Sequence, residues 1–354
     1  MISPPSRARS TSPPRARSAR RLALALCAAL AAAALGAPAG AQGKRYNAGN
    51  WDASAQRVVV RAGLMSEAPG GGFAGASPLT AQAAAQALAA LSARTQAPAV
   101  AVQANARITL TRFDSLLVAQ LGLGDVAAHV QRTAAAAGLK PPAYFGTEVV
   151  ARFLGLRYNH PAGEDSLELY PSDQITRAEA AHSLAVALEA GEWEAESARR
   201  TLEAFSLPRY STPQLEVLRI AVSKIGMPYV WGGTTDGTED GLAHGGYDCS
   251  GFAWRVYKVS GLRSGAAILG RTAAEQAGEI PKSARVPLRA VQPADLLFFG
   301  SAHFDSKATE ANVTHEGIAL SSEWAIHSSS QGVYVLPLDS GWLASSFAWA
   351  RRVM

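Results

Sequence analysis

The fold of the C-terminal part of the chain is decided by the stretch YDCSGF, which occupies residues 247–252. Asp248 is a good helix N-cap residue. Apolar side chains follow it at helical spacing, at Phe252, Val256 and Val259, until Gly261. The pattern therefore predicts a helix whose first turn carries Cys249. Because free backbone N–H groups and the positive end of the helix dipole favour a thiolate, we expect this cysteine to be reactive.

The first 41 residues have the three-part layout of a secretory signal peptide. Six arginines without an acidic residue precede an apolar run over 22–35, and Ala39-Gly40-Ala41 follows. That run is shorter than the roughly 20 residues needed to cross a bilayer. We therefore expect cleavage before Gln42 and a secreted or cell-envelope protein with no membrane span after cleavage. A twin-arginine address at Arg20-Arg21 is the alternative interpretation.

Cleavage would change both the charge and the cysteine content of the chain. It lowers the formal net charge from +5 to about −1, so the composition does not indicate a nucleic-acid partner. It also removes Cys27 and leaves Cys249 as a lone cysteine. An exported chain with one thiol cannot form an internal disulfide, so Cys249 is either an apolar filler or a reactive group.

Composition divides the remainder into segments. Residues 42–76 show no lasting hydrophobic period, so we expect a poorly ordered lead-in. Residues 77–205 are rich in Ala, Leu and Glu, which predicts an all-α helical-repeat domain. The proline-containing stretch 206–213 predicts a linker, and a second domain is expected over 214–354.

A short pattern recurs within the helical domain. Its copies are Leu79-Thr80-Ala81, Leu110-Thr111-Arg112 and Ile175-Thr176-Arg177. Thr176 with Glu179 predicts a capping box at a helix start, and Thr111 with Asp114 predicts a weaker one.

The last copy carries a resemblance. The stretch YPSDQITRAEAAHSLAVAL, residues 170–188, resembles the end of an S-layer homology repeat, a helical module that binds cell-wall polymers in its family. This resemblance implies that Arg177, and Arg112 in the weaker copy, bind an anionic cell-wall polymer. An ordinary capped helix in a generic helical domain is the alternative.

The segment after the Cys249 helix predicts strands. Short β-like runs at 296–299, 317–320, 324–327 and 332–336 favour an α+β domain with an antiparallel sheet. If the second and third runs form a hairpin turning near Ser322, His327 lies opposite Gly317. It is then a diagonal neighbour of His315 on the same face. One imidazole could therefore orient the other beside Cys249.

The whole segment from about 214 to 353 resembles the NlpC-type cell-wall peptidases, papain-like Cys-His enzymes that cut peptidoglycan stem peptides. The matching pieces stand in the family's order: GMPYVWGG (226–233), DCSGF (248–252), PADLLFF (293–299), THEGIAL (314–320) and AIHSSS (325–330). The resemblance implies Cys249 as nucleophile, His315 as general base and His327 as the residue that orients it. It also implies that the substrate's N-terminal part is bound by Tyr229, Asp248 and Ser250. The implied reaction is hydrolysis of the bond between D-glutamate and the diamino acid.

Three features depart from the family pattern. Glu316 replaces the usual apolar residue after the catalytic histidine, and Ala294 replaces the glycine of a PGD-like turn. The polar loop 301–313 contains His303, a competitor for the role of base. An amidase or acyltransferase on the same Cys-His frame, and a non-catalytic wall-binding protein, remain alternatives. No zinc-type ligand spacing occurs, so we expect neither metal nor cofactor.

Overall fold

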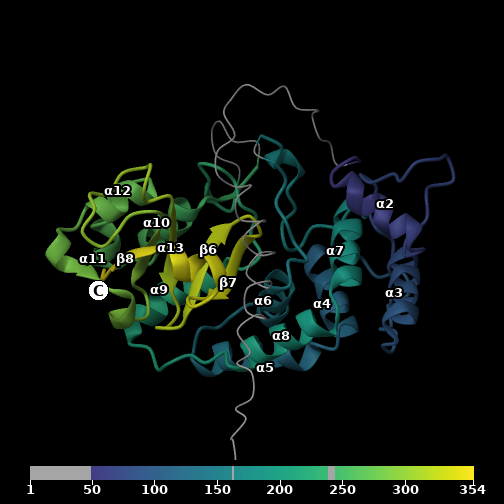
Figure 1. Cartoon of the computed structure of the whole chain (residues 1–354), viewed down its shortest axis with the longest axis horizontal. Helices are drawn as coiled ribbons and strands as arrows, with labels where there is room; N and C mark the ends of the chain where they lie inside the picture. The colour runs from purple at the N-terminus through teal and green to yellow at the C-terminus, as the bar shows by residue number, and fades with distance from the viewer. Residues whose placement is uncertain (1–48, 162, 238–243) are drawn as a thin grey trace, which may run out of the picture. The chain divides into compact units, whose positions relative to one another are not determined.

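The computed structural model describes residues 49–354 except 162 and 238–243 (Figure 1). The predicted signal peptide over 1–41 lies outside the described residues. Contacts between Cα atoms assign residues 41–354 to one compact unit. Within the described residues, no helix is both long enough and apolar enough to cross a membrane.

An antiparallel sheet forms the centre of the C-terminal half. Six strands of the described residues form this sheet, in the order β3-β8-β4-β5-β6-β7. Their bounds are Arg285–Val286 (β3), Leu296–Phe299 (β4), His315–Ala319 (β5), Trp324–Ser329 (β6), Gly332–Pro337 (β7) and Phe347–Arg351 (β8). The four strands predicted from the sequence are confirmed as β4 to β7, whereas β3 and β8 were not predicted. A two-stranded ladder pairs Thr234–Thr235 (β1) with Gly246–Tyr247 (β2).

The predicted hairpin register is confirmed. Gly317 on β5 pairs with His327 on β6, and Ile318 pairs with Ile326. A side chain on Gly317 would bring its Cβ to 3.0 Å from the Cβ of His327, so glycine permits this close approach. The register places His315 and His327 on the same face, two positions apart along the ladder.

Short helices surround this sheet. They are Thr212–Ser223 (α9), Cys249–Val259 (α10), Arg263–Ala266 (α11), Ala273–Gly278 (α12) and Gly341–Ser346 (α13), with single 3₁₀ turns at Lys282–Ala284 and Leu288–Ala290. Helix α10 packs against β5, β6 and α9 (Figure 1). It does so through fully buried Phe252, Ala253, Val256 and Tyr257. Ser211 is the N-cap residue of α9.

The N-terminal half is helical, as predicted. Its helices are Ala53–Arg61 (α2), Ala81–Thr95 (α3), Leu110–Gln120 (α4), Gly124–Ala136 (α5), Phe145–Phe153 (α6), Arg177–Glu189 (α7) and Glu192–Glu203 (α8), with a 3₁₀ turn at Asp165–Leu167. Helix α2 contradicts the poorly ordered lead-in expected over 42–76. It forms because Ala55 and Val59, one turn apart, are buried where α2 packs against α7.

Three helix starts meet in this half. Threonines 80, 109 and 176 cap α3, α4 and α7, and each follows a fully buried aliphatic residue: Leu79, Ile108 and Ile175. The backbone N–H of Leu79 donates to the carbonyl of Ile175 at 2.8 Å, and that of Ile175 donates to Ile108 at 3.0 Å. The predicted cap at Thr111 is therefore wrong, because Thr109 accepts from the N–H of Arg112.

The expected capping box at Thr176 forms only in part. The Thr176 hydroxyl accepts from the N–H of Glu179 at 3.2 Å. The Glu179 carboxylate does not return to the helix start, since it pairs with Arg157 at 3.4 Å and with His160 at 3.1 Å. Glu179, which the sequence motif predicts as a capping residue, therefore forms buried ion pairs instead.

The proline-containing stretch 206–213 does not separate two packed bodies. At its start, the ring of Phe205 packs edge-on against Trp324 with centroids 4.9 Å apart. At its other end, the hydroxyl of Tyr210 donates to the carbonyl of Leu320 at 2.9 Å. One buried apolar cluster contains residues of both halves. The predicted linker therefore marks a change of composition inside a continuous core.

Candidate active site

The predicted helix start at Cys249 is confirmed. Asp248 is the N-cap of α10, and its carboxylate accepts from the N–H of Gly251 at 2.6 Å. Cys249 is half-buried, and the nearby backbone N–H groups of Ser250 and Glu316 act to lower the pKa of its thiol. The nearness of the Glu316 N–H places the thiol close to the beginning of β5, the strand that carries His315.

The two histidines form the predicted pair. His315 Nε2 lies 2.8 Å from His327 Nδ1, and one of these nitrogens donates to the other. Their rings are nearly perpendicular, at 88°, with centroids 5.0 Å apart. Trp342 packs 5.0 Å from the His315 ring, and Tyr334 packs 4.3 Å from the His327 ring. The orientation of His315 is thus fixed by a hydrogen bond and by aromatic packing.

Burial controls the charge of these groups. It raises the pKa of the Cys249 thiol to about 12, and the negative charge of Asp248 acts in the same direction. It lowers the pKa of His315 to about 3 and that of His327 well below its usual value. The thiolate expected from the helix dipole is therefore not the resting form. These shifts favour a neutral thiol and a neutral imidazole pair.

Asp248 is held by a residue that the sequence analysis missed. Arg271 donates to both carboxylate oxygens of Asp248, at 3.0 and 2.8 Å, and to the Ser250 hydroxyl at 3.1 Å. The N–H of Gly232 also donates to Asp248, at 2.9 Å. The capping box of Thr272 and Glu275 marks the start of α12 and could have located Arg271 beside it. The capping-box motif does not indicate that Arg271 binds Asp248.

Tyr229 lies in the same neighbourhood. Its side chain is half-buried, and burial raises its pKa, helped by the nearby Cys249 and Asp248. Its backbone carbonyl accepts from the side-chain amide of Asn159 at 2.6 Å. The structure thus brings together Tyr229, Asp248 and Ser250, as the sequence analysis expected.

Glu316 lies on the opposite face of β5 from His315. Its side chain is completely buried, and neither carboxylate oxygen has a hydrogen-bond partner among the described residues. Burial raises its pKa well above the usual value, opposed chiefly by the positive charge of Arg351. Burial therefore favours the protonated form of this side chain. The second departure, Ala294, takes a left-handed φ of 67°, the conformation that the missing glycine would favour.

The remaining predicted residues lie elsewhere. His303 is exposed in its loop, where its backbone N–H donates to Ser306. Arg177 is used within the fold: it donates to the carbonyls of Phe73 at 2.9 Å and Ser66 at 2.5 Å, and its guanidinium stacks on the Phe73 ring. Arg112 is exposed and occupies a different position relative to its helix cap.

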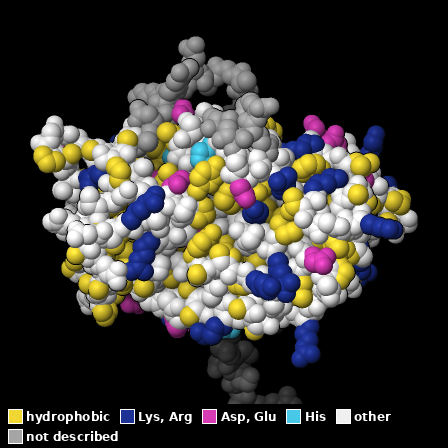
Figure 2. All heavy atoms as spheres, turned by 180° about the vertical axis from the view of Figure 1, so that it is seen from behind, with side chains coloured by type: hydrophobic (Ala, Val, Ile, Leu, Met, Phe, Trp, Pro, Cys, Tyr) yellow, Lys and Arg dark blue, Asp and Glu magenta, His cyan; other side chains and the backbone are white. Residues whose placement is uncertain are grey.

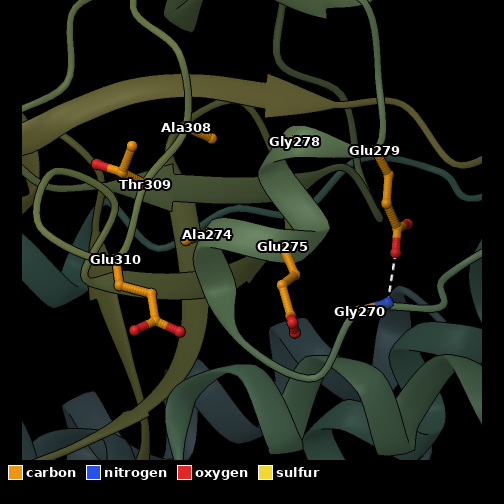
Figure 3. A pocket seen from close by; sticks show the side chains of 8 residues that line it. All are labelled: Gly270, Ala274, Glu275, Gly278, Glu279, Ala308, Thr309 and Glu310. Carbon is orange, nitrogen blue, oxygen red and sulfur yellow. Dashed lines mark hydrogen bonds between the residues drawn. The ribbon is translucent and has the colours of Figure 1, made fainter.

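A surface hollow of about 490 Å³ lies outside the cluster of Cys249 and the two histidines (Figure 3). Its lining comes from the α12 region and the loop before β5: Gly270, Ala274, Glu275, Gly278, Glu279, Ala308, Thr309 and Glu310. Glu279 is occupied by the backbone N–H groups of Leu269 and Gly270 and by Arg351. None of Cys249, His315 and His327 lines this hollow. In the face shown in Figure 2, Lys and Arg side chains are scattered between apolar ones.

An α+β domain that sets a helix-start cysteine against a histidine pair on adjacent antiparallel strands has the groups needed for nucleophilic acyl transfer. Residues 226–352 match the NlpC/P60 family, so the C-terminal part carries an NlpC/P60 domain.

Several relatives are similar over this part of the chain. A probable endopeptidase of Mycobacterium tuberculosis (strain ATCC 25618 / H37Rv) is 32% identical over 126 residues, 35% of this chain and 26% of the relative. The bifunctional muramidase/DL-endopeptidase CwlT of Bacillus subtilis (strain 168) is 32% identical, over 36% of this chain and 32% of the relative. The gamma-D-glutamyl-L-lysine dipeptidyl-peptidase of the same strain is 29% identical, over 33% and 32%.

The chain thus spans about a quarter to a third of the length of these curated relatives. A crystal structure of an NlpC/P60 family protein from Bacillus cereus ATCC 10987 is 26% identical over 42% of each chain, with a TM-score of 0.31.

Proposed function

We propose that this protein is a peptidoglycan hydrolase that cuts amide bonds of the stem peptide with Cys249 as its nucleophile. The observation that carries the proposal is the position of Cys249 at the start of α10, a helix that packs against β5 and β6, the two strands that hold the hydrogen-bonded pair His315 and His327. The match of residues 226–352 to the NlpC/P60 family supports it.

The reaction follows from the neutral resting forms. As the sulfur attacks the substrate carbonyl, His315 takes the thiol proton, so charge develops only during the attack. His315 then gives this proton to the leaving amine, and a thioester joins the acyl group to Cys249. Water, deprotonated by His315, releases the carboxylic acid and restores the thiol. His327 keeps the His315 ring in one orientation throughout these steps.

The bond we propose joins D-glutamate to the diamino acid. Support comes from a relative named gamma-D-glutamyl-L-lysine dipeptidyl-peptidase, which is similar to this chain over the part that carries Cys249 and the two histidines. Tyr229, Asp248 and Ser250 line the position for the N-terminal part of the substrate. Because both Asp248 oxygens are engaged by Arg271, Asp248 contacts substrate as one member of an ion pair.

The place of action follows from the substrate and from the N-terminal sequence. Peptidoglycan lies outside the cell membrane, and residues 1–41 have the layout of a signal peptide. We therefore propose a secreted or cell-envelope protein that works without a cofactor. Binding of an anionic wall polymer by the helical half, through Arg177 and Arg112, stays a prediction that a wall-sedimentation assay tests.

Mass spectrometry of digested peptidoglycan fragments tests the proposal. The wild-type protein should release products cut on the carboxyl side of the γ-linked D-glutamate. Cys249→Ala should release none while keeping the folded circular-dichroism spectrum, since the thiol is small and lies at a helix start. Alkylation of the wild-type protein with iodoacetamide should reproduce the loss. Continued cleavage by Cys249→Ala would remove Cys249 from the mechanism, and products cut elsewhere would change the substrate bond.

A further inference from the structure

One residue of the helical half bridges two segments of the catalytic half. The backbone N–H of Asn159 donates to the carbonyl of Ser330 at 2.7 Å, and its side-chain amide donates to the carbonyl of Tyr229 at 2.6 Å. Ser330 lies three residues after His327, just beyond the end of β6. Asn159 therefore ties the segment that carries Tyr229 to the end of β6, the strand that carries His327.

The Tyr229 segment lies between β7 and the helical half. On one side, the N–H of Gly226 donates to Val333, and the N–H of Val333 donates to Met227, both at 2.8 Å. On the other side, the buried guanidinium of Arg152 donates to the carbonyl of Gly226 at 3.2 Å. Helix α6, which carries Arg152, packs against β7 (Figure 1). The start of the segment is thus held on both sides.

The Tyr229 carbonyl needs a different donor. Tyr229 follows Gly226 and Met227, the two residues that bond to Val333. Among the described residues, the donor to its carbonyl is the side-chain amide of Asn159. An amide side chain suits this position because it donates through nitrogen while the residue's backbone N–H remains free for Ser330. A short bond to a carbonyl restricts the backbone of Tyr229 and so limits where its ring can lie.

We propose that Asn159 is a positioning residue that sets the place of Tyr229 in the substrate site, so that the helical half contributes to substrate binding. This inference rests on the proposed function of Cys249 and on the predicted role of Tyr229 in holding the substrate. It assigns the helical half a task inside the reaction, in addition to any anchoring to the wall.

Steady-state kinetics on a purified muropeptide tests the inference. Asn159→Asp keeps the size of the side chain and the backbone N–H, but presents an acceptor to the Tyr229 carbonyl. It should raise KM by about tenfold or more, the loss expected for a bond worth about 1.4 kcal/mol. The kcat and the rate of Cys249 alkylation by iodoacetamide should change by less than about threefold, because the thiol and its histidines do not contact Asn159.

A matched control lies in the same half. Arg199 forms a surface ion pair with Asp125 at 2.6 Å, and its other polar contacts among the described residues, Glu203 and the carbonyl of Gly122, also lie in the helical half. Arg199→Ala should leave KM unchanged. A second arm uses Asn159→Ala in a Tyr229→Ala background. If Asn159 acts through Tyr229, removing it there should not raise KM further.

Each outcome decides the inference. An unchanged KM for Asn159→Asp in an active protein would overturn it and leave the proposed function intact. Equal losses in kcat and in alkylation rate, with a lowered melting temperature, would also overturn it, because Asn159 would then support only the fold. A further rise in KM in the Tyr229→Ala background would show that Asn159 acts by another route. Absence of hydrolysis by the wild-type protein would instead refute the proposed function.

Discussion

Replacing Glu316 by glutamine should change how the stability of the protein depends on pH. Burial raises the pKa of Glu316 in the folded state, so the fold keeps a proton that the unfolded chain loses above about 4.5. The contribution of Glu316 is therefore most favourable below that pH and is lost as the pH rises towards the folded-state value. Over that window the free energy of unfolding falls by about 1.4 kcal/mol per pH unit. Glutamine carries no charge and removes this slope.

Urea denaturation at pH 5.5 and pH 7.0 measures the effect. As long as Glu316 stays protonated in the fold, the free energy of unfolding of Glu316→Gln relative to wild type should rise by about 2 kcal/mol between these pH values. Titrations that are common to both proteins cancel in this difference. Glu323→Gln, an exposed change at the β5–β6 turn, serves as control and should run parallel to wild type. Parallel curves for Glu316→Gln would refute the reasoning, since they would mean that Glu316 is ionised in the fold.

Three further predictions concern the histidines and Arg177. His315→Ala should lower kcat/KM for a muropeptide by about 10² to 10⁴-fold, the scale of a lost general base, and His327→Ala should lower it less. His303→Ala should change kcat/KM by less than about twofold, and a larger loss than in His315→Ala would reverse the assignment of the base. Arg177→Ala should lower the free energy of unfolding in urea by about 1–2 kcal/mol, because two carbonyls lose their donor. Sedimentation with purified walls then tests whether Arg177 also binds polymer, since such binding should weaken with salt and with this change.

The histidine pair could be predicted because strand geometry is local. Side chains alternate along a strand, so the position of the turn near Ser322 fixes which residues share a face. The register Gly317 to His327 follows from that position, and the structure confirms it. The helix start at Cys249 was equally accessible, because an N-cap aspartate and an apolar period are both signals within one segment.

The charge state of Cys249 could not be predicted in the same way. A helix N-terminus stabilises an anion by about 0.3–1 kcal/mol. Burial in the folded protein raises the thiol pKa from 9.0 to about 12, which corresponds to about 4 kcal/mol against the thiolate. The second effect is larger, and it arises because strands such as β5, from a different part of the chain, pack against the helix that carries the thiol.

The cap of α4 shows how packing overrides a local motif. The sequence offers two threonines, and the acid at Asp114 favours Thr111 as the cap. Thr109 caps the helix because the residue before it, Ile108, is buried and paired with Ile175. Asp114 is buried too, and both of its oxygens accept from Arg157, at 2.8 and 2.9 Å. The motif's acid therefore serves an ion pair that sequence spacing alone does not reveal.

The same ion pair bears on how the helical half reaches the catalytic site. Arg157 lies two residues before Asn159, and His160 follows it directly. Arg157 and His160 are both buried among the acids Asp114 and Glu179, so they fix the segment on the helical side. Asn159, between them, turns to the catalytic half and binds Tyr229. A buried ion pair contributes little to net stability, yet it holds geometry because removing one partner costs about 3–5 kcal/mol. The buried charges of the helical half are therefore best explained as the support that keeps Asn159 in place.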